Sequence, residues 1–171
     1  MTSRMAASLV LAIALVAAIA QGFYYYPLLP DRVASHFGPS GEADDWMSRG
    51  GFMAVYAGTL GFTAATMIVL AALMPRLPMS LLNVPHKPYW SAADHQPRLM
   101  RLMTSFLFWM GAGTVLFLTA VIERVFAANL TPEPRLGAEI WWMLGAYGCF
   151  VAGLLVPLMW VLYTAPRRHD E

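Results

Sequence analysis

The stretch "SLVLAIALVAAIA", residues 8–20, decides the class of this protein, because it runs for thirteen residues without one charged side chain. It lies inside a neutral run that extends from residue 5 to residue 30, and three similar runs follow at 50–75, 102–122 and 140–166. A helix needs roughly 20 mainly apolar residues to cross a bilayer. The sequence therefore predicts four membrane-spanning helices, at about residues 5–26, 51–74, 100–124 and 138–164.

The composition supports this prediction. Charged residues make up 12% of the 171-residue chain, and its mean hydropathy is +0.55, whereas a soluble domain carries about 25% charged residues. A membrane β-barrel would alternate apolar and polar residues along each strand, and neither residues 8–20 nor "GLLVPLMWVLY", residues 153–163, do so. We expect an all-α membrane protein, a four-helix transmembrane bundle that forms a single domain over residues 1–171.

The positive charges predict the orientation of this bundle, because cytoplasmic segments of membrane proteins are enriched in Lys and Arg. With the N-terminus inside, the inner segments hold seven such residues and the outer segments hold four. We therefore expect both termini in the cytoplasm, an outer loop at residues 27–49 and an inner loop at residues 75–98. The inner residues are Arg4, Arg76, Lys87, Arg98, Arg101, Arg167 and Arg168, and the outer ones are Arg32, Arg49, Arg124 and Arg135.

The first apolar segment has a second interpretation. Arg4, the apolar run and Ala18-Ile19-Ala20 together resemble a secretory signal peptide with its cleavage site. The neutral run continues, however, into the tyrosines at positions 24–26, and such a cluster suits a helix end at the membrane interface. We interpret the segment as a retained helix.

Small residues spaced four apart predict how the helices pack, because helices in lipid associate through close backbone approach. Three such stripes favour a tight bundle, and the neutral runs contain no ionisable side chain of the kind that pumps and transporters use. Cys149, the only cysteine, is expected to be a packing residue. The stripes are Ala14, Ala18 and Gly22; Ala57, Gly61 and Ala65; and Gly145, Cys149 and Gly153.

The outer loop concentrates polar side chains. Pro30 and Asp31 could start a short helical turn that places Val33 and Phe37 on one side, and "GPSG", residues 38–41, predicts a turn. This turn separates His36 from two aspartates, and we expect His36 to pair across it with Asp44 or Asp45. His36, Glu42, Asp44 and Asp45 could also bind zinc or manganese, but their spacing matches no metal motif, so no metal or other cofactor is expected. Ser35 beside His36 does not indicate a catalytic pair.

The inner loop contains five prolines and several apolar residues. "SAAD", residues 91–94, has the form of a capping box and could begin the third helix. "NVPHKPYW", residues 83–90, predicts an interfacial anchor, with Lys87 at lipid phosphates and two aromatic residues at headgroup level, or alternatively a protein-docking surface. The candidate residues of this inner surface are Asn83, Pro85, Lys87, Tyr89 and Trp90.

The outer loop resembles the signature of a family of small bacterial membrane domains of unknown function, the type found at the N-terminus of SdpI-like immunity proteins. The pattern is Leu-Pro-x-x-Val/Ile-Pro-x-His-Phe/Trp followed by Gly, Asp and a basic residue. Ala34 and Ala43 stand where proline is usual, and "LLNVPHKPYW" resembles a second signature, with His86 in place of asparagine. The matching residues are Leu29, Pro30, Val33, His36, Phe37, Gly41, Asp44 and Arg49, the last in place of lysine.

This resemblance implies a multi-pass protein of the bacterial cytoplasmic membrane. In SdpI-like relatives the role is immunity to a secreted peptide toxin, so we expect a non-enzymatic protein that senses, or confers immunity to, an extracellular peptide. The alternatives are an accessory subunit of a larger membrane complex and, third, a membrane enzyme. No catalytic residue and no nucleic-acid partner are expected; the partners are the bilayer and a peptide or another membrane protein. The candidate outer surface is formed by Pro30, His36, Phe37, Gly41, Asp44, Asp45 and Arg49.

Overall fold

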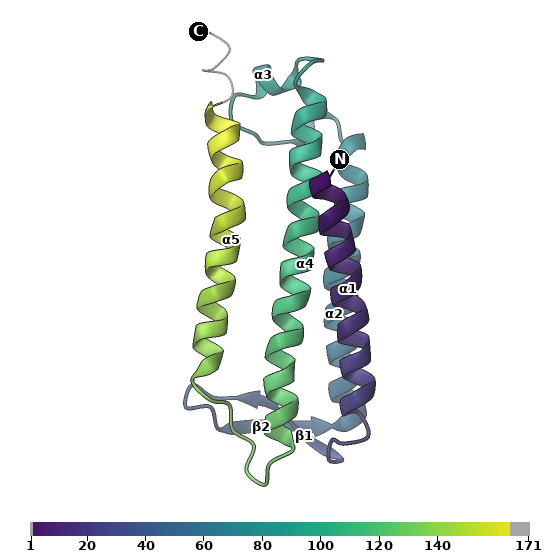
Figure 1. The fold of residues 1–171 in the computed structure, drawn as a ribbon, viewed down its shortest axis with the longest axis vertical. Helices are drawn as coiled ribbons and strands as arrows, with labels where there is room; N and C mark the ends of the chain where they lie inside the picture. Colours follow the sequence, from purple (N-terminus) through teal and green to yellow (C-terminus); the bar gives the residue numbers. More distant parts are fainter. Residues whose placement is uncertain (1, 165–171) are drawn as a thin grey trace.

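The computed structural model describes residues 2–164, which form four long helices side by side (Figure 1). Each of the four is long and apolar enough to cross a membrane, which agrees with the predicted number of spans and supports a multi-pass membrane protein. The first helix begins and the last helix ends at the same end of the bundle. Arg167 and Arg168, which entered the prediction of orientation, lie outside the described residues. The helices are α1 (Thr2–Tyr25), α2 (Arg49–Leu73), α4 (Gln96–Asn129) and α5 (Glu139–Thr164).

The expectation of an all-α protein needs a correction, because a two-stranded antiparallel sheet connects α1 to α2. Strand β1 (Arg32–Phe37) pairs with strand β2 (Ala43–Ser48) across the turn at residues 38–41. The helical turn predicted after Pro30 is therefore wrong. A single isolated turn of helix closes few hydrogen bonds for the backbone freedom that it loses, whereas the extended strand pairs with β2 and places Val33 and Ala34 in fully buried positions.

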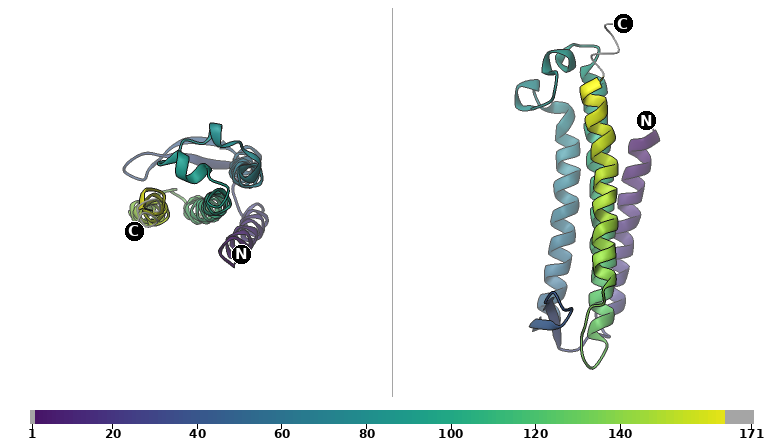
Figure 2. Two further views of the ribbon diagram at one scale, coloured as in Figure 1. Left: turned by 90° about the horizontal axis from the view of Figure 1, so that it is seen from above. Right: turned by 90° about the vertical axis from the view of Figure 1, so that its left-hand side faces the viewer.

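Helix α4 is the centre of the bundle, since α1, α2 and α5 each pack against it (Figure 2). The first stripe of small residues is buried in the bundle: Ala14 and Ala18 are 1% exposed. The stripes on α2 and α5 are exposed instead. An open groove of about 510 Å³ between α1 and α2 reaches Gly61, and no atom of a neighbouring helix lies within 4 Å of a Cβ built on Gly145 or Gly153. The tight four-helix packing expected from these stripes is therefore wrong.

Helix α5 attaches to α4 along a single face. The ring of Phe150 occupies the space that a side chain at Gly113 would need, and Tyr147 stacks on Phe117 with 4.4 Å between ring centroids. The hydroxyls of Tyr147 and Thr114 share a 2.8 Å hydrogen bond. Leu162 is the one residue of α5 that is fully buried in the described part of the chain. Cys149 is exposed rather than packed, so most of α5 faces outward.

The end of the bundle opposite the sheet carries two 3₁₀ turns, η1 (Met74–Arg76) and η2 (Met79–Leu81), and a short helix, α3 (Lys87–Ser91). The "SAAD" segment does not begin the third long helix. That helix starts at Gln96, after His95, whose side chain makes no capping hydrogen bond, and Ala92 is the C-cap of α3. Pro97 explains this start, because proline at the first positions of a helix loses no intrahelical hydrogen bond.

Helix α4 continues to Asn129 and therefore contains Glu123 and Arg124, which the sequence analysis placed at its end. The Glu123 carboxylate joins three helices through side chains of α1. It accepts hydrogen bonds from Tyr25 Oη at 2.5 Å and from Gln21 Nε2 at 2.6 Å. Tyr56 of α2 donates to Gln21 Oε1 at 2.6 Å. The carboxylate is tolerated here because its oxygens have donors.

Candidate binding site at the hairpin end

The side chain of Asn129, at the end of α4, ties strand β1 to the bundle. Its Oδ1 accepts from the backbone N–H of Ala34 at 2.7 Å, and its Nδ2 donates to the carbonyl oxygen of Ala34 at 3.1 Å. Nδ2 also donates to the Val125 carbonyl at 2.9 Å. The amide thus completes the hydrogen bonds of a buried strand residue as a neighbouring strand would. A proline at position 34 has no N–H and could not donate to Asn129. This explains why alanine stands at the position where the family signature has proline.

The turn at 38–41 is built by glycine at a position that no other residue fits. Gly41 has φ +82°, and a Cβ there would collide with the Leu136 carbonyl oxygen. The close approach allows the Leu136 N–H to donate to the Gly41 carbonyl at 2.8 Å. Beside it, Glu42 and Arg135 form a β-bridge and a 3.3 Å ion pair. The turn is therefore held against the connection between α4 and α5.

Arg49, a candidate binding residue, instead clamps the chain where the hairpin meets the helices. Its guanidinium donates to the Leu29 carbonyl at 3.0 Å and to Asp31 Oδ1 at 3.1 Å. It also lies over the ring of Tyr26, 5.1 Å from the centroid. These contacts tie the segment after α1 to the start of α2, so Arg49 stabilises the base of the hairpin. Pro30 lies exposed beside this clamp.

The histidine and the acidic residues of the hairpin bond to different partners. His36 Nδ1 lies 2.5 Å from Asp44 Oδ1, the pairing expected across the turn, with both side chains more than half exposed. Asp45 accepts a hydrogen bond from the N–H of Trp46 at 2.8 Å, and Glu42 pairs with Arg135. Within residues 2–164, no three His, Cys, Asp or Glu side chains come together as a metal site would require.

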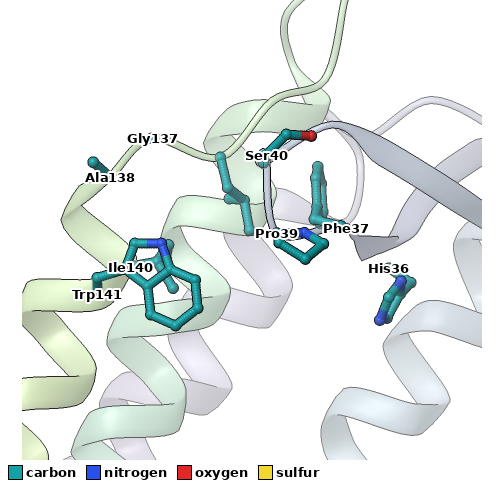
Figure 3. A pocket seen from close by; sticks show the side chains of 11 residues that line it. His36, Phe37, Pro39, Ser40, Gly137, Ala138, Ile140 and Trp141 are labelled. Carbon is teal, nitrogen blue, oxygen red and sulfur yellow. The ribbon is translucent and has the colours of Figure 1, made fainter.

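A cavity of about 480 Å³ opens between the hairpin tip and the start of α5. Figure 3 shows Phe37, Pro39 and His36 on the hairpin side, and Ile140 and Trp141 on the α5 side. Apolar surface forms most of its wall, and His36 and Ser40 are the polar residues among those that line it. Such a combination of apolar wall and few polar groups is typical of ligand sites.

The structure brings only part of the predicted outer surface to this cavity. His36, Phe37 and Gly41 line it, whereas Pro30, Asp44, Asp45 and Arg49 do not. Sequence reasoning missed the second wall, residues 136–141, and the supporting Asn129. The signals in the sequence were the aromatic pair Trp141–Trp142 beside a polar connection, and an asparagine at the end of an apolar helix.

The predicted inner surface is only partly exposed. Trp90 is fully buried, and its Nε1 donates to the Leu162 carbonyl at 3.3 Å, so it cannot belong to a docking surface or an interfacial anchor. Tyr89 stacks on His95 with 3.9 Å between ring centroids, and Lys87 Nζ donates to the Ser80 carbonyl at 3.1 Å. Asn83 is exposed and Pro85 is half-buried. These residues mainly join α3 to the ends of α4 and α5.

His86 at this end adopts a left-handed backbone conformation, with φ +51° and ψ +45°. Asparagine and histidine are among the non-glycine residues that tolerate this region best. The family signature has asparagine at position 86. The left-handed backbone at this position therefore restricts the choice of residue.

Residues 12–60 match the family described as Domain of unknown function (DUF1648). The match begins in α1, includes the whole hairpin and ends in α2, so it covers one wall of the cavity and none of α4 or α5. No curated protein and no solved structure matches the chain. The match agrees with the expected family of domains of unknown function, and the relation to SdpI-like proteins stays a prediction.

Proposed function

We propose that this protein is a non-enzymatic receptor of the bacterial cytoplasmic membrane that senses, or confers immunity to, an extracellular peptide through the cavity at the hairpin end. The observation that carries the proposal is the construction of this cavity. Its walls come from two segments about 100 residues apart in sequence, and backbone hydrogen bonds and an ion pair lock these segments together. A site formed before the ligand arrives loses less entropy on binding.

The chemistry of the walls favours a peptide with an apolar side chain beside a polar or charged group. Trp141 is 61% exposed and presents its ring to the cavity, and tryptophan is enriched among residues that dominate binding energy. His36 also lines the cavity, and its imidazole is paired with Asp44. No converging nucleophile and base support the alternative of an enzyme among the described side chains of this cavity.

Selection from a phage-displayed peptide library tests this function, with the protein held in lipid nanodiscs and empty nanodiscs as the background. We expect enriched peptides to bind the Trp141→Ala variant at least about ten-fold more weakly, the loss typical of a central aromatic residue. Trp142→Ala is the matched control, because Trp142 is 81% exposed and does not line the cavity. Absence of enrichment, or equal binding to both variants, would contradict the proposal.

The orientation of this receptor is part of the proposal. We expect the hairpin end outside the cell, so a cysteine introduced at Ser40 in a Cys149→Ala background should react with a membrane-impermeant reagent on intact cells. A reporter that is active only in the cytoplasm should be active when fused after Glu171. Labelling of Ser40→Cys only after lysis would reverse the assignment.

The second candidate is an accessory subunit of a larger membrane complex, favoured by the free surface of α5. None of the residues in the most apolar window of α5 is buried, and Val156 and Trp160 are 66% and 64% exposed. Native gel electrophoresis of gently solubilised membranes tests this function. A complex larger than the chain, lost in a Val156→Trp variant that stays in the membrane, would favour the subunit over the receptor.

A further inference from the structure

A second cleft opens at the α3 end, on the side of the bundle where α1 meets the first turns of α4. It measures about 930 Å³ and shares no lining residue with the hairpin cavity at the other end. Three arginines line it: Arg4 from α1, and Arg98 and Arg101 from α4. Pro75 of η1 also lines it. We refer to these residues together as the arginine cleft.

The positive charge of the arginine cleft is not neutralised by acidic side chains of the described chain. The three ion pairs found in residues 2–164 involve His36, Arg49 and Arg135, all at the hairpin end. Arg4 lies over the ring of Phe108, 5.6 Å from the centroid. Asp94 is the nearest acid along the sequence to Arg98 and Arg101, but it is exposed and does not line the cleft.

Thr104 provides an independent observation. Threonines in membrane helices usually donate to the carbonyl four residues earlier, as Thr114 and Thr119 do here. Thr104 is 2% exposed and lines the cleft, yet its hydroxyl has no hydrogen-bond partner within residues 2–164. A buried hydroxyl without a partner is unfavourable, so a ligand in the cleft that bonds to it would relieve this loss.

The walls beside these polar groups are apolar. Met5 of α1 and Met100 and Leu102 of α4 line the same cleft, and Met5 is 64% exposed. The cleft therefore combines guanidinium groups at the end of two spanning helices with apolar surface that continues along them. A phosphate bearing acyl chains satisfies both parts, because arginine binds phosphate oxygens with paired hydrogen bonds, and basic pockets between spanning helices bind anionic lipid headgroups.

We propose that the arginine cleft is a binding site for an anionic phospholipid, whose phosphate lies between Arg4, Arg98 and Arg101 and whose acyl chains follow the apolar walls between α1 and α4. Nothing in the proposed receptor function requires this site. Lipid bound here would join α1 to the start of α4 at the end where the hairpin cannot do so.

The test uses the full chain in a non-ionic detergent, titrated with dioleoyl phosphatidylglycerol or with dioleoyl phosphatidylcholine, which has the same chains and no net charge. We expect only the anionic lipid to raise the midpoint of thermal unfolding, because a ligand that binds the folded state stabilises it. In the Arg98→Gln, Arg101→Gln variant the affinity should fall roughly five-fold for each arginine removed.

Arg76→Gln is the matched control. It removes one positive charge at the same end, but Arg76 does not line the cleft and donates instead to the Ala72 carbonyl at 2.8 Å. This variant should keep the full response to phosphatidylglycerol. An equal response of the double variant, or an equal loss in Arg76→Gln, would overturn the site and leave only general attraction to a charged surface.

Two further arms keep the proposal testable. If sodium phosphate protects the wild type as well as phosphatidylglycerol does, the cleft takes free phosphate and the lipid assignment is overturned. If the double variant does not fold, photoactivatable phosphatidylglycerol is cross-linked to the wild-type protein. We expect adducts on the peptides that contain Met5 and Leu102, displaced by unlabelled phosphatidylglycerol and not by phosphatidylcholine. Adducts spread evenly over α5 and these peptides would refute the proposal.

Discussion

Replacing Asn129 by alanine should loosen strand β1 while the helices stay folded. The substitution removes both bonds to Ala34, whose side chain and backbone are shielded from solvent at 0% exposure. Each orphaned backbone group is unfavourable by about 1–3 kcal/mol. Alanine has a better helix propensity than asparagine, which offsets roughly 0.5 kcal/mol of this loss. Water can also bond to the exposed backbone groups when β1 separates from α4, which reduces the loss of stability further. We expect a net local destabilisation of about 2 kcal/mol.

The assay is hydrogen exchange of the peptide that contains β1, followed by mass spectrometry in detergent. A local loss of about 2 kcal/mol corresponds to roughly 30-fold faster exchange in residues 32–37. Exchange in the middle of α4 should not change. Asn83→Ala is the control, since Asn83 is exposed at the opposite end. If β1 exchanges equally in both variants, Asn129 does not hold the strand and the argument fails.

Three other substitutions test other parts of the structure, and each has a matched control. Tyr25→Phe removes the hydroxyl bonded to Glu123 and should reduce the free energy of unfolding in detergent by about 0.5–1.5 kcal/mol. Tyr24→Phe, at an exposed neighbour, should have little effect. Equal unfolding midpoints of the two variants would show that the bond to Glu123 contributes nothing. Gly41→Ala should expose the turn to proteases, because of its positive φ and its contact with the α4–α5 connection. Gly50→Ala should not, because a Cβ at Gly50 would meet no neighbouring atom within 4 Å. An unchanged cleavage rate at the turn would count against its docking on the α4–α5 connection. His86→Asn should preserve stability and His86→Val should reduce it by about 1–2 kcal/mol, since a β-branched residue resists the left-handed conformation; equal thermal midpoints of the two variants would refute this.

The spanning helices could be predicted from the sequence because lipid imposes a requirement that is visible locally. Each helix must present about 20 apolar residues, and the four neutral runs meet this requirement. The ends could not be read in the same way. Glu123 resembled a helix terminus, yet α4 continues for another turn and a half, because Tyr25 and Gln21 on α1 supply donors for the carboxylate.

The hairpin and the helix contacts could not be predicted in this way, because they depend on residues that are far apart in the sequence. Residues 32–37 are half polar and carry no strong strand pattern, and the chain turns through "GPSG" rather than a common two-residue hairpin turn. The small-residue stripes on α2 and α5 had the correct spacing, but small residues also face lipid, and only one stripe forms a contact. The His36–Asp44 pair was predictable because both residues flank one turn, whereas the wall at 136–141 lies far along the sequence.

The central position of α4 has a consequence for synthesis of the chain. Since α1 and α2 pack mainly on α4, the first two spans enter the membrane before their common partner exists. Ala34 and Asn129 are 95 residues apart, and at about 5–20 residues per second a ribosome needs roughly 5–20 s to cover that distance. During this interval the hairpin lacks its anchor, and Glu123, the partner of Tyr25, has not been made. Quality-control proteases of the membrane would therefore meet a nascent chain with two unassembled helices, and the emergence of α4 is the event that ends this exposure.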